Sequence, residues 1–274
     1  MTATQRTKPA LTPDSFAYEI RRLVLQESKR AGVGHIGSSL SIAEIIGLLY
    51  SGVLKIKSPA DPERDRFILS KGHAVLALYA ALHLKGFITR EELATFCNDG
   101  TRLCGHPEVE VPGIDFATGS LGMGLSFGVG SALAARKANS SRQVFVLVSD
   151  AELNEGALWE SVLFAGHHRL SNLIVFVDQN GQQALGYTKD VLDTGSVEKK
   201  FNAFNWDTHV VDGHDCQQML NVVNKLDYKS AAPHVLIAKT TFGKGVSYME
   251  NQIQWHYLPM TDEQFDQAIK EIGG

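Results

Sequence analysis

The chain has 274 residues, of which 44% are hydrophobic and 20% are charged, and its formal net charge at pH 7 is −4. This length is sufficient for one large domain with its own core. The mild acidity and the lack of a polybasic stretch argue against nucleic acid or an anionic membrane surface as a partner. No apolar run reaches the ~18 residues of a membrane span, and the polar first residues lack the apolar segment of a signal peptide.

Three cysteines, Cys97, Cys104 and Cys216, form neither a CxxC pair nor an even set. This pattern is typical of inert thiols in a reducing compartment, so we expect a cytoplasmic protein. The chain contains no repeat and no low-complexity linker. Residues 1–274 are therefore expected to form a single domain, in which residues 1–12 are flexible.

Helix-start signals recur along the chain. Thr12-Pro13 predicts a helix that runs to about Arg30 and closes near Gly32, because proline is favoured in the first turn of a helix and glycine just after the last. Capping boxes, in which Ser or Thr is followed three residues later by Glu or Gln, predict further helices. They begin at Ser41 for a helix over residues 42–50, at Thr89 for a helix to about Phe96, and at Thr261 for the last helix.

Short apolar runs rich in β-branched residues separate the helical segments and predict buried strands. The alternation of strands and helices predicts an α/β fold, with a mostly parallel sheet that is covered by helices on both faces. The expected strands are Phe67–Leu69, Val144–Val148, Leu173–Val177, His209–Val211 and Val235–Ala238.

The segment from Gln143 to Gln183 reads as strand, helix, strand, a crossover that makes the two strands parallel. Asp150 follows the first strand and Asn180 follows the second, so both are expected at one edge of the sheet. Parallel sheets bind ligands at this edge, and a helix N-terminus there favours phosphate. Carboxylate, amide and main-chain oxygens suit Mg²⁺ or Ca²⁺. The residues predict a metal-bridged diphosphate site; the alternative is that Asp150 only caps the helix.

Several motifs resemble the thiamine diphosphate-binding half of the transketolase family. The acidic residue that closes a strand, the ELNEG helix start of residues 152–156 and the DQN of residues 178–180 resemble its metal motif. The segment TGSLGMG, residues 118–124, resembles the family's TGPLGQG loop. Four histidines resemble the family's active-site histidines in order and local wording: His35 in GVGHIGSS, His73 in SKGHAVLALY, His106 in CGHPEVEVPG and His256 in IQWHYLP. The resemblance extends from about Phe16 to about Pro259.

This resemblance implies thiamine diphosphate and Mg²⁺ (or Ca²⁺) as cofactors, with the metal held by Asp150, Asn180 and the carbonyl of Gln182. It implies that His73 and His256 face the diphosphate and the upper hydroxyls of the substrate, and that His35 and His106 face the hydroxyls of C1 to C3. All four histidines are thus candidate catalytic residues. The implied cofactor-binding set is His73, Gly119, Leu121, Asp150, Ala151, Glu152, Glu155, Asn180 and His256, with Glu155 in a carboxylate network across a subunit boundary.

In the family, the glutamate that activates the cofactor lies in a second, pyrimidine-binding domain, which this chain does not resemble. The resemblance therefore implies one subunit of a split transketolase, active with a C-terminal partner chain in an α2β2 assembly. Such an enzyme moves a two-carbon ketol unit from a ketose, expected to be phosphorylated, to an aldehyde. Sugars are the expected substrates; nucleic acid and membrane are not expected partners.

Two departures from the family pattern leave alternatives open. Ser149 and Ala151 replace the glycines that flank the acidic residue, and Gln182, Gln183 and Ala184 replace aliphatic residues that pack on the cofactor. A Cβ at position 151 would be strained if its φ were positive. The alternatives are another thiamine diphosphate-dependent carboligase or decarboxylase subunit, and a catalytically silent scaffold for the partner chain.

Overall fold

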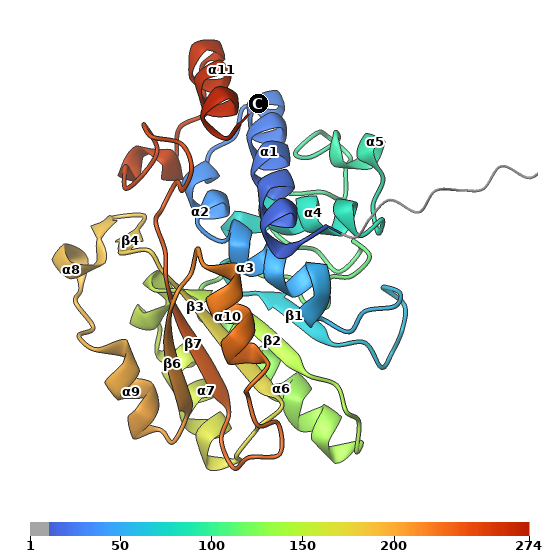
Figure 1. Cartoon of the computed structure of the whole chain (residues 1–274), viewed down its shortest axis with the longest axis vertical. Coiled ribbons are helices and arrows are strands. Elements are labelled where there is room, and N and C mark those ends of the chain that lie inside the picture. The colour runs from blue at the N-terminus through green and yellow to red at the C-terminus, as the bar shows by residue number, and fades with distance from the viewer. Residues whose placement is uncertain (1–10, 274) are drawn as a thin grey trace, which may run out of the picture.

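The computed structural model describes residues 11–273 and contains one five-stranded parallel sheet (Figure 1). The expected flexibility of residues 1–12 lies almost wholly outside the described residues, and Thr12 itself is the N-cap of the first helix. All five expected strands are present. In the order in which they lie in the sheet they are β1 (Arg66–Leu69), β2 (Val144–Ser149), β3 (Leu173–Gln179), β7 (His234–Lys239) and β6 (Asp207–Asp212).

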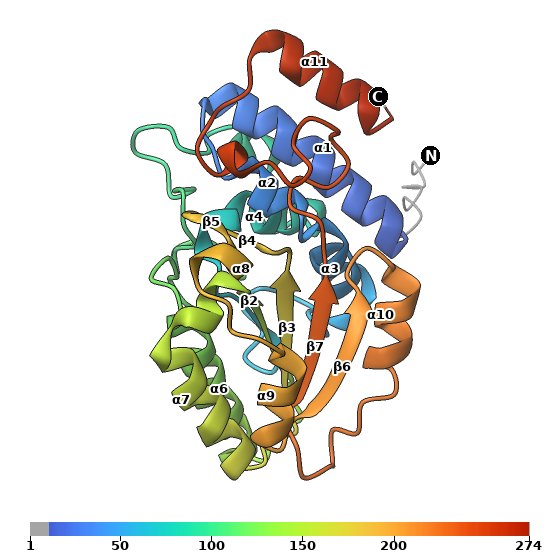
Figure 2. The same cartoon turned by 90° about the vertical axis from the view of Figure 1, so that its left-hand side faces the viewer.

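Helices cover both faces of the sheet, as predicted (Figure 2). Alternate strand residues point to opposite faces, so Phe145 joins one buried cluster and Val146 joins the other. The first cluster packs under α1 (Pro13–Ala31), α3 (Ala43–Leu48), α4 (Val75–Leu84) and α10 (Cys216–Val223), and the second under α6 (Met123–Lys137), α7 (Gly156–His167) and α9 (Val197–Ala203). The remaining helices are α2 (Ile36–Leu40), α5 (Arg90–Leu93), α8 (Thr188–Val191) and α11 (Asp262–Glu271).

The helix boundaries confirm most of the capping signals and correct one. Gly32 ends α1 in the left-handed conformation, and Thr261 and Gln264 form the expected capping box of α11. Thr89 caps α5, but that helix ends at Leu93, short of Phe96. The capping box at Ser41 is wrong. Its hydroxyl donates to the carbonyl of Ser38 and to Asp178. The predicted helix is present as α3 followed by a π-helical turn (Leu49–Val53), and α2 precedes it.

The carboxyl edge of the sheet brings together the residues that end neighbouring strands. Ser149 lies opposite Asp178 in the parallel register of β2 and β3. A small hairpin that the sequence did not predict, β4 (Gln182–Gln183) and β5 (Gly186–Tyr187), follows β3 and folds over this edge. Among the described residues, no helix is both long enough and apolar enough to cross a membrane.

Candidate functional site

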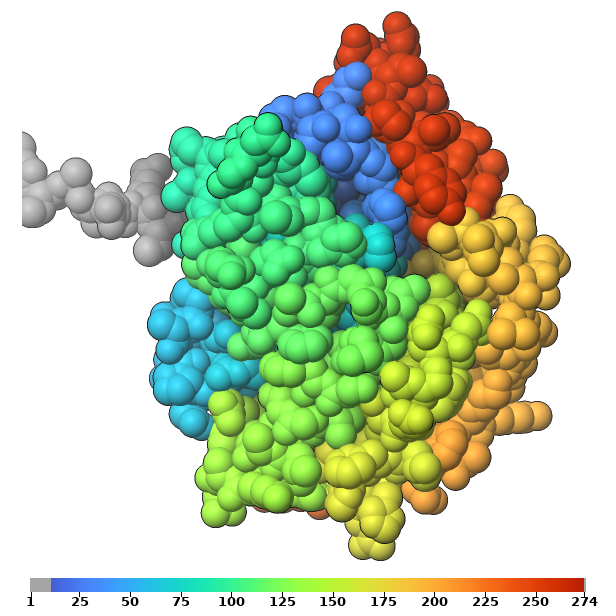
Figure 3. Space-filling view, turned by 180° about the vertical axis from the view of Figure 1, so that it is seen from behind, coloured from blue at the N-terminus to red at the C-terminus, as the bar shows by residue number. Residues whose placement is uncertain are grey.

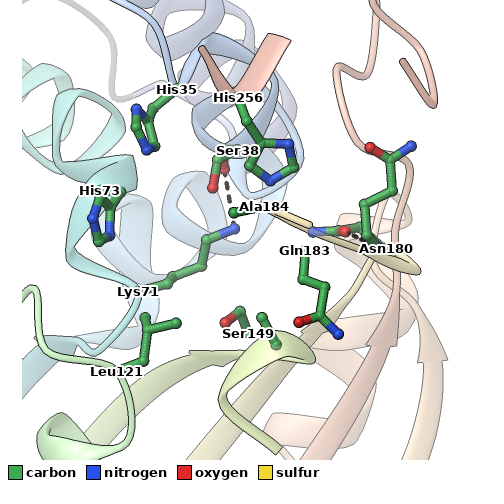
Figure 4. A pocket seen from close by; sticks show the side chains of 12 residues that line it. His35, Ser38, Lys71, His73, Leu121, Ser149, Asn180, Gln183, Ala184 and His256 are labelled. Atoms are coloured by element: carbon green, nitrogen blue, oxygen red, sulfur yellow. Dashed lines mark hydrogen bonds between the residues drawn. The ribbon is translucent and has the colours of Figure 1, made fainter. Parts of the chain in front are cut away.

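A hollow of about 110 Å³ lies at the carboxyl edge of β2 and β3. Figure 3 shows one face of the molecule, on which segments from the N-terminal, central and C-terminal parts of the chain meet. Of the residues expected from the sequence, His35, His73, Leu121, Ala151, Asn180, Gln182 and His256 line it (Figure 4). Three positions that the sequence analysis named as departures from the family pattern, Ser149, Gln183 and Ala184, also line it, and sequence reasoning missed two lining residues, Ser38 and Lys71.

Asp150 and Asn180 meet at one edge, as the crossover predicted. The main-chain N–H of Gly181 donates to Oδ2 of Asp150 at 2.6 Å, and Asp150 makes no side-chain cap of the following 3₁₀ turn. Its other oxygen, Oδ1, is buried without a hydrogen-bond partner among the described residues. Burial, together with the nearby charge of Asp178, raises the pKa of Asp150 to about 7. A buried carboxylate oxygen without a donor fits a bound cation, which would compensate its charge.

The amide of Asn180 has a fixed orientation. Its Nδ2 donates to Asp178 at 2.9 Å, and its Oδ1 accepts the N–H of Gln182 at 2.9 Å. The carboxylate and the amide oxygen thus each accept a main-chain N–H from the turn that begins the hairpin, those of Gly181 and Gln182. Within the described residues no group of three or more His, Cys, Asp or Glu side chains could hold a metal, and the expected donor set includes just one such side chain, Asp150.

Asp178 and Lys71 form a buried ion pair beneath the pocket, which the sequence reasoning missed. Asp178 also accepts from Ser41 at 2.8 Å and from the hydroxyl of Thr240. Burial alone would raise the pKa of Asp178, but the Lys71 ammonium and these donors hold it below its usual value. The sequence contained a signal for this pair, because Lys71 lies two residues before His73 and Asp178 lies two residues before Asn180.

The two positions that depart from the family pattern are accommodated without strain. Ser149 and Glu152 bond reciprocally: the N–H of Ser149 donates to Oε2 of Glu152 at 2.9 Å, and the N–H of Glu152 donates to the Ser149 hydroxyl at 3.3 Å. This is the hydrogen-bond pattern of a capping box. Ala151 is not among the residues with positive φ, so its Cβ carries no backbone penalty.

Glu152 does not line the pocket, contrary to the expected cofactor contact. Its side chain is fully buried, and both of its oxygens are occupied by donors from this chain. Besides Ser149, it accepts from the hydroxyl of Ser70 at 2.5 Å and from the N–H of Gly122 at 2.9 Å. Glu152 therefore supports the loop that carries Gly119 and Leu121. Glu155 is exposed at the start of α7, where its carboxylate is free to face another chain.

The four expected histidines converge on the pocket from four separate segments. The rings of His35 and His73 stack with centroids 4.9 Å apart, and those of His73 and His106 meet edge to face at 4.5 Å. His256 stacks on Phe242 at 4.2 Å, and its carbonyl accepts the N–H of His35 at 3.1 Å. His106 lies behind His73 and does not line the pocket wall itself.

Close packing around this cluster requires glycine at specific positions. Gly119 has a φ of +152°, and a Cβ there would lie 2.8 Å from the ring of His106. A Cβ on Gly34 would lie 2.6 Å from the carbonyl oxygen of Tyr257. The glycines beside the histidines thus let the loops approach one another closely enough to gather the rings.

Burial, with smaller effects of nearby charged groups, lowers the pKa of three of these histidines, His35, His73 and His256. Desolvation, followed by the effect of His73 and the other nearby cations, lowers the pKa of His35 to about 4. Desolvation likewise lowers the pKa of His256 to about 4, and that of His73 below its usual value. Near neutral pH these rings can each accept or donate a proton, which suits transfer to and from hydroxyl groups.

Comparison of this sequence with known protein families identifies the family to which the chain belongs. The family profile described as "Transketolase, thiamine diphosphate binding domain" matches residues 13–274. The chain belongs to the transketolase family. It is 39% identical over 254 residues to one subunit of the apulose-4-phosphate transketolase of Phocaeicola vulgatus, covering 92% of this chain and 90% of that relative. It is 40% identical over 256 residues to the 6-deoxy-6-sulfo-D-fructose transketolase subunit SqwG of Clostridium sp., covering 92% of this chain and 93% of the relative.

Solved transketolases have the same fold. The crystal structure of the transketolase from Campylobacter jejuni superposes with a TM-score of 0.90 at 32% identity, covering 95% of this chain. This chain spans 42% of the length of that transketolase. The expected fold class and the recognition of the diphosphate-binding half of a transketolase are therefore confirmed.

Proposed function

We propose that this chain is the thiamine diphosphate-binding subunit of a two-chain transketolase that moves a two-carbon ketol unit from a phosphorylated ketose to an aldehyde. The observation that carries the proposal is the convergence of His35, His73, His106 and His256 beside the edge that presents Asp150 and Asn180. A polyhydroxylated donor needs several neutral proton-transfer groups along its length, and a simple 2-oxoacid does not. The histidine set thus favours ketol transfer over decarboxylation.

Asp150, Asn180 and the carbonyl of Gln182 are the residues that we propose hold Mg²⁺, or Ca²⁺ in its place. The unpartnered Oδ1 of Asp150 supports this assignment. Thiamine diphosphate, when bound, supplies the carbon nucleophile of the reaction. Gly119, Leu121, Ala151, His73 and His256 are proposed to contact it, whereas Glu152 acts indirectly by holding Gly122 and Ser70 in place.

The charges at the edge suit a metal–diphosphate ligand. Asp178 carries negative charge and Lys71 carries positive charge, and a bound cation would favour the ionised form of Asp150; all three side chains are buried. A divalent cation would leave this group net positive, and an anionic diphosphate would then be attracted to it. Without the cation the diphosphate would face Asp150 directly, so we expect cofactor binding to require the metal.

The histidines are proposed to transfer protons at the substrate hydroxyls. His35 and His106 would serve the hydroxyls of C1 to C3, and His73 and His256 those nearer the diphosphate. The low pKa of His35 and of His256 supports neutral rings at the start of the reaction. Neutral imidazoles can take up a proton as the C2–C3 bond of the ketose breaks and return it to the product.

The partner is proposed to be a second chain that carries the pyrimidine-binding domain and the activating glutamate. The relatives of matching length are named as subunits, and this chain spans less than half of the Campylobacter transketolase. We propose a single diphosphate-binding domain in this chain, an α2β2 assembly with the exposed Glu155 at the boundary, and a cytoplasmic location consistent with its three free cysteines.

The silent-scaffold alternative rested on the loss of two motif glycines. Ala151 keeps a negative φ and lines the pocket, and Ser149 is absorbed into the bonding of Glu152, so neither change removes the site. Calorimetric titration of the assembled complex with thiamine diphosphate and Mg²⁺ separates the two functions. Saturable binding supports the enzyme function. An absence of binding at millimolar cofactor would instead support the silent-scaffold function.

A further inference from the structure

Two tyrosines join the β4–β5 hairpin to the C-terminal segment of the pocket in a reciprocal manner. Tyr187, on the hairpin, donates its hydroxyl to the carbonyl of Asn251 at 3.1 Å. Tyr257, on the C-terminal segment, donates its hydroxyl to the carbonyl of Ala184 on the hairpin. Each segment thus contributes one donor and one acceptor, and the two bonds span separations of 64 and 73 residues along the chain.

The segments joined in this way form two walls of the pocket. The hairpin wall carries Gln182, whose carbonyl is a proposed metal ligand, and the C-terminal wall carries His256, the neighbour of Tyr257. The C-terminal wall is tied in turn to His35, whose N–H donates to the carbonyl of His256 at 3.1 Å. A change in the position of the hairpin relative to Tyr257 would therefore change the spacing between the metal side and the histidine side of the site.

Few other contacts hold the hairpin. Leu185 at its turn is 81% exposed, and Tyr187 is 45% exposed, so little apolar burial fixes it. At its base Gln182 is buried and the N–H of Gly181 donates to Asp150 at 2.6 Å. Beyond the base, the other side-chain bond from the hairpin to the body of the protein, within the described residues, is that from Nε2 of Gln183 to Asn154 at 3.2 Å. Segments with little buried area open locally at a low free-energy cost. In such a segment, individual hydrogen bonds contribute a large share of the restraint.

We infer that Tyr187 and Tyr257 are positioning residues, which lock the hairpin onto the His256 wall so that the pocket is formed before its ligand arrives. The consequence for cofactor binding rests on the proposed function. Pre-organisation lowers the cost of ordering a site on binding. Loss of the two hydroxyls raises the KM for the cofactor and leaves kcat at saturating cofactor unchanged, because neither hydroxyl touches the reacting groups.

The test uses Tyr187→Phe, Tyr257→Phe and the double variant, which remove the hydroxyls and keep the rings. Tyr228→Phe is the matched control, since its hydroxyl also donates to a main-chain carbonyl, that of Val223, at 3.3 Å and away from the pocket. Amide hydrogen exchange of residues 180–192 in the full chain without ligand reports on the hairpin directly. Exchange should accelerate roughly two- to tenfold for each hydroxyl removed, the range for one net hydrogen bond.

The same variants, assembled with the partner, are then assayed against thiamine diphosphate with Mg²⁺. The KM for the cofactor should rise by a similar factor, with kcat within twofold of the unmodified enzyme. Unchanged exchange in the double variant would overturn the inference, as would faster exchange with an unchanged KM. A complex that binds no thiamine diphosphate at all would defeat the proposed function, and the exchange rates would still decide whether the tyrosines hold the hairpin.

Discussion

Lys71 and Asp178 form an ion pair beneath the candidate site, although they are 107 residues apart in the chain. Asp178 is completely buried and Lys71 is 4% exposed, so neither charge is screened by water. Because Asp178 also holds the amide of Asn180, the pair links the loop before His73 to the proposed metal side of the pocket. The ion pair therefore affects both the stability of the chain and the placement of the residues that form the pocket.

Replacing Lys71 with methionine should destabilise the chain by about 3–5 kcal/mol, because Asp178 would remain as an uncompensated buried charge. Urea unfolding of the isolated chain measures this loss. The double variant Lys71→Met with Asp178→Asn should recover part of it, since no unpaired charge remains. Lys239→Met is the control, because Lys239 is exposed and its ammonium bonds a neutral side chain, that of Gln179. A Lys71→Met variant as stable as the control would contradict the assignment.

Removal of the metal should weaken cofactor binding strongly, because the diphosphate would then face Asp150 without a cation between them. Calorimetric titration of the assembled complex with thiamine diphosphate should show an affinity lower by several kcal/mol in EDTA, and a similar loss for Asp150→Ala. Asp190→Ala, an exposed aspartate on α8, provides the control. Equal affinities with Mg²⁺, with EDTA and for Asp150→Ala would show that Asp150 is not a metal ligand.

His35→Ala and His106→Ala should each lower kcat/KM by roughly 10²–10⁴-fold, the range for loss of a general acid–base group. Cofactor affinity should change little, since neither ring belongs to the set of residues that we propose hold the cofactor or the metal. Steady-state kinetics of the assembled enzyme give both quantities. His167→Ala serves as the matched control, because His167 is exposed at the far end of α7. If either variant has the same kinetics as the unmodified enzyme, the histidine that it lacks has a structural role.

The pH dependence of stability should reveal the buried His256. Its pKa is about 4 in the folded chain, below the ordinary value of 6.5, so between these values the unfolded chain binds the extra proton. The stability that neutral His256 contributes is present above pH 6.5 and is lost as the pH falls toward 4, up to about 3 kcal/mol. His35 behaves in the same way.

Unfolding of the unmodified chain and of His256→Asn should therefore be compared between pH 4 and 7. The raised pKa of Asp150 acts in the opposite direction, and it cancels in the difference between the two proteins. The difference in the free energy of unfolding should shrink or change sign in favour of the variant as the pH falls. A difference that stays constant over this range would show that His256 titrates normally.

The sequence predicted the parallel sheet and the meeting of Asp150 with Asn180, because strand periodicity and the crossover rule depend only on local patterns. It also predicted the set of four histidines, from the sequence motifs in which they lie. It did not predict the Lys71–Asp178 pair, the reciprocal bonds of Ser149 and Glu152, or the tyrosine bonds of the hairpin. Each of these depends on side chains from distant segments, whose approach is set by the packing of the whole chain. The false capping box at Ser41 has the same origin, since a tertiary bond to Asp178 takes the hydroxyl that would have capped the helix.

We propose above all that this chain supplies one half of a transketolase. The most direct test is ketol transfer from a ketose phosphate to an aldose, measured for this chain alone, for a chain carrying the pyrimidine-binding half alone, and for the mixture, all with thiamine diphosphate and Mg²⁺. We expect no turnover by either chain alone and full turnover by the mixture. Full activity from this chain alone, or a mixture in which both chains remain inactive monomers, would contradict this proposal.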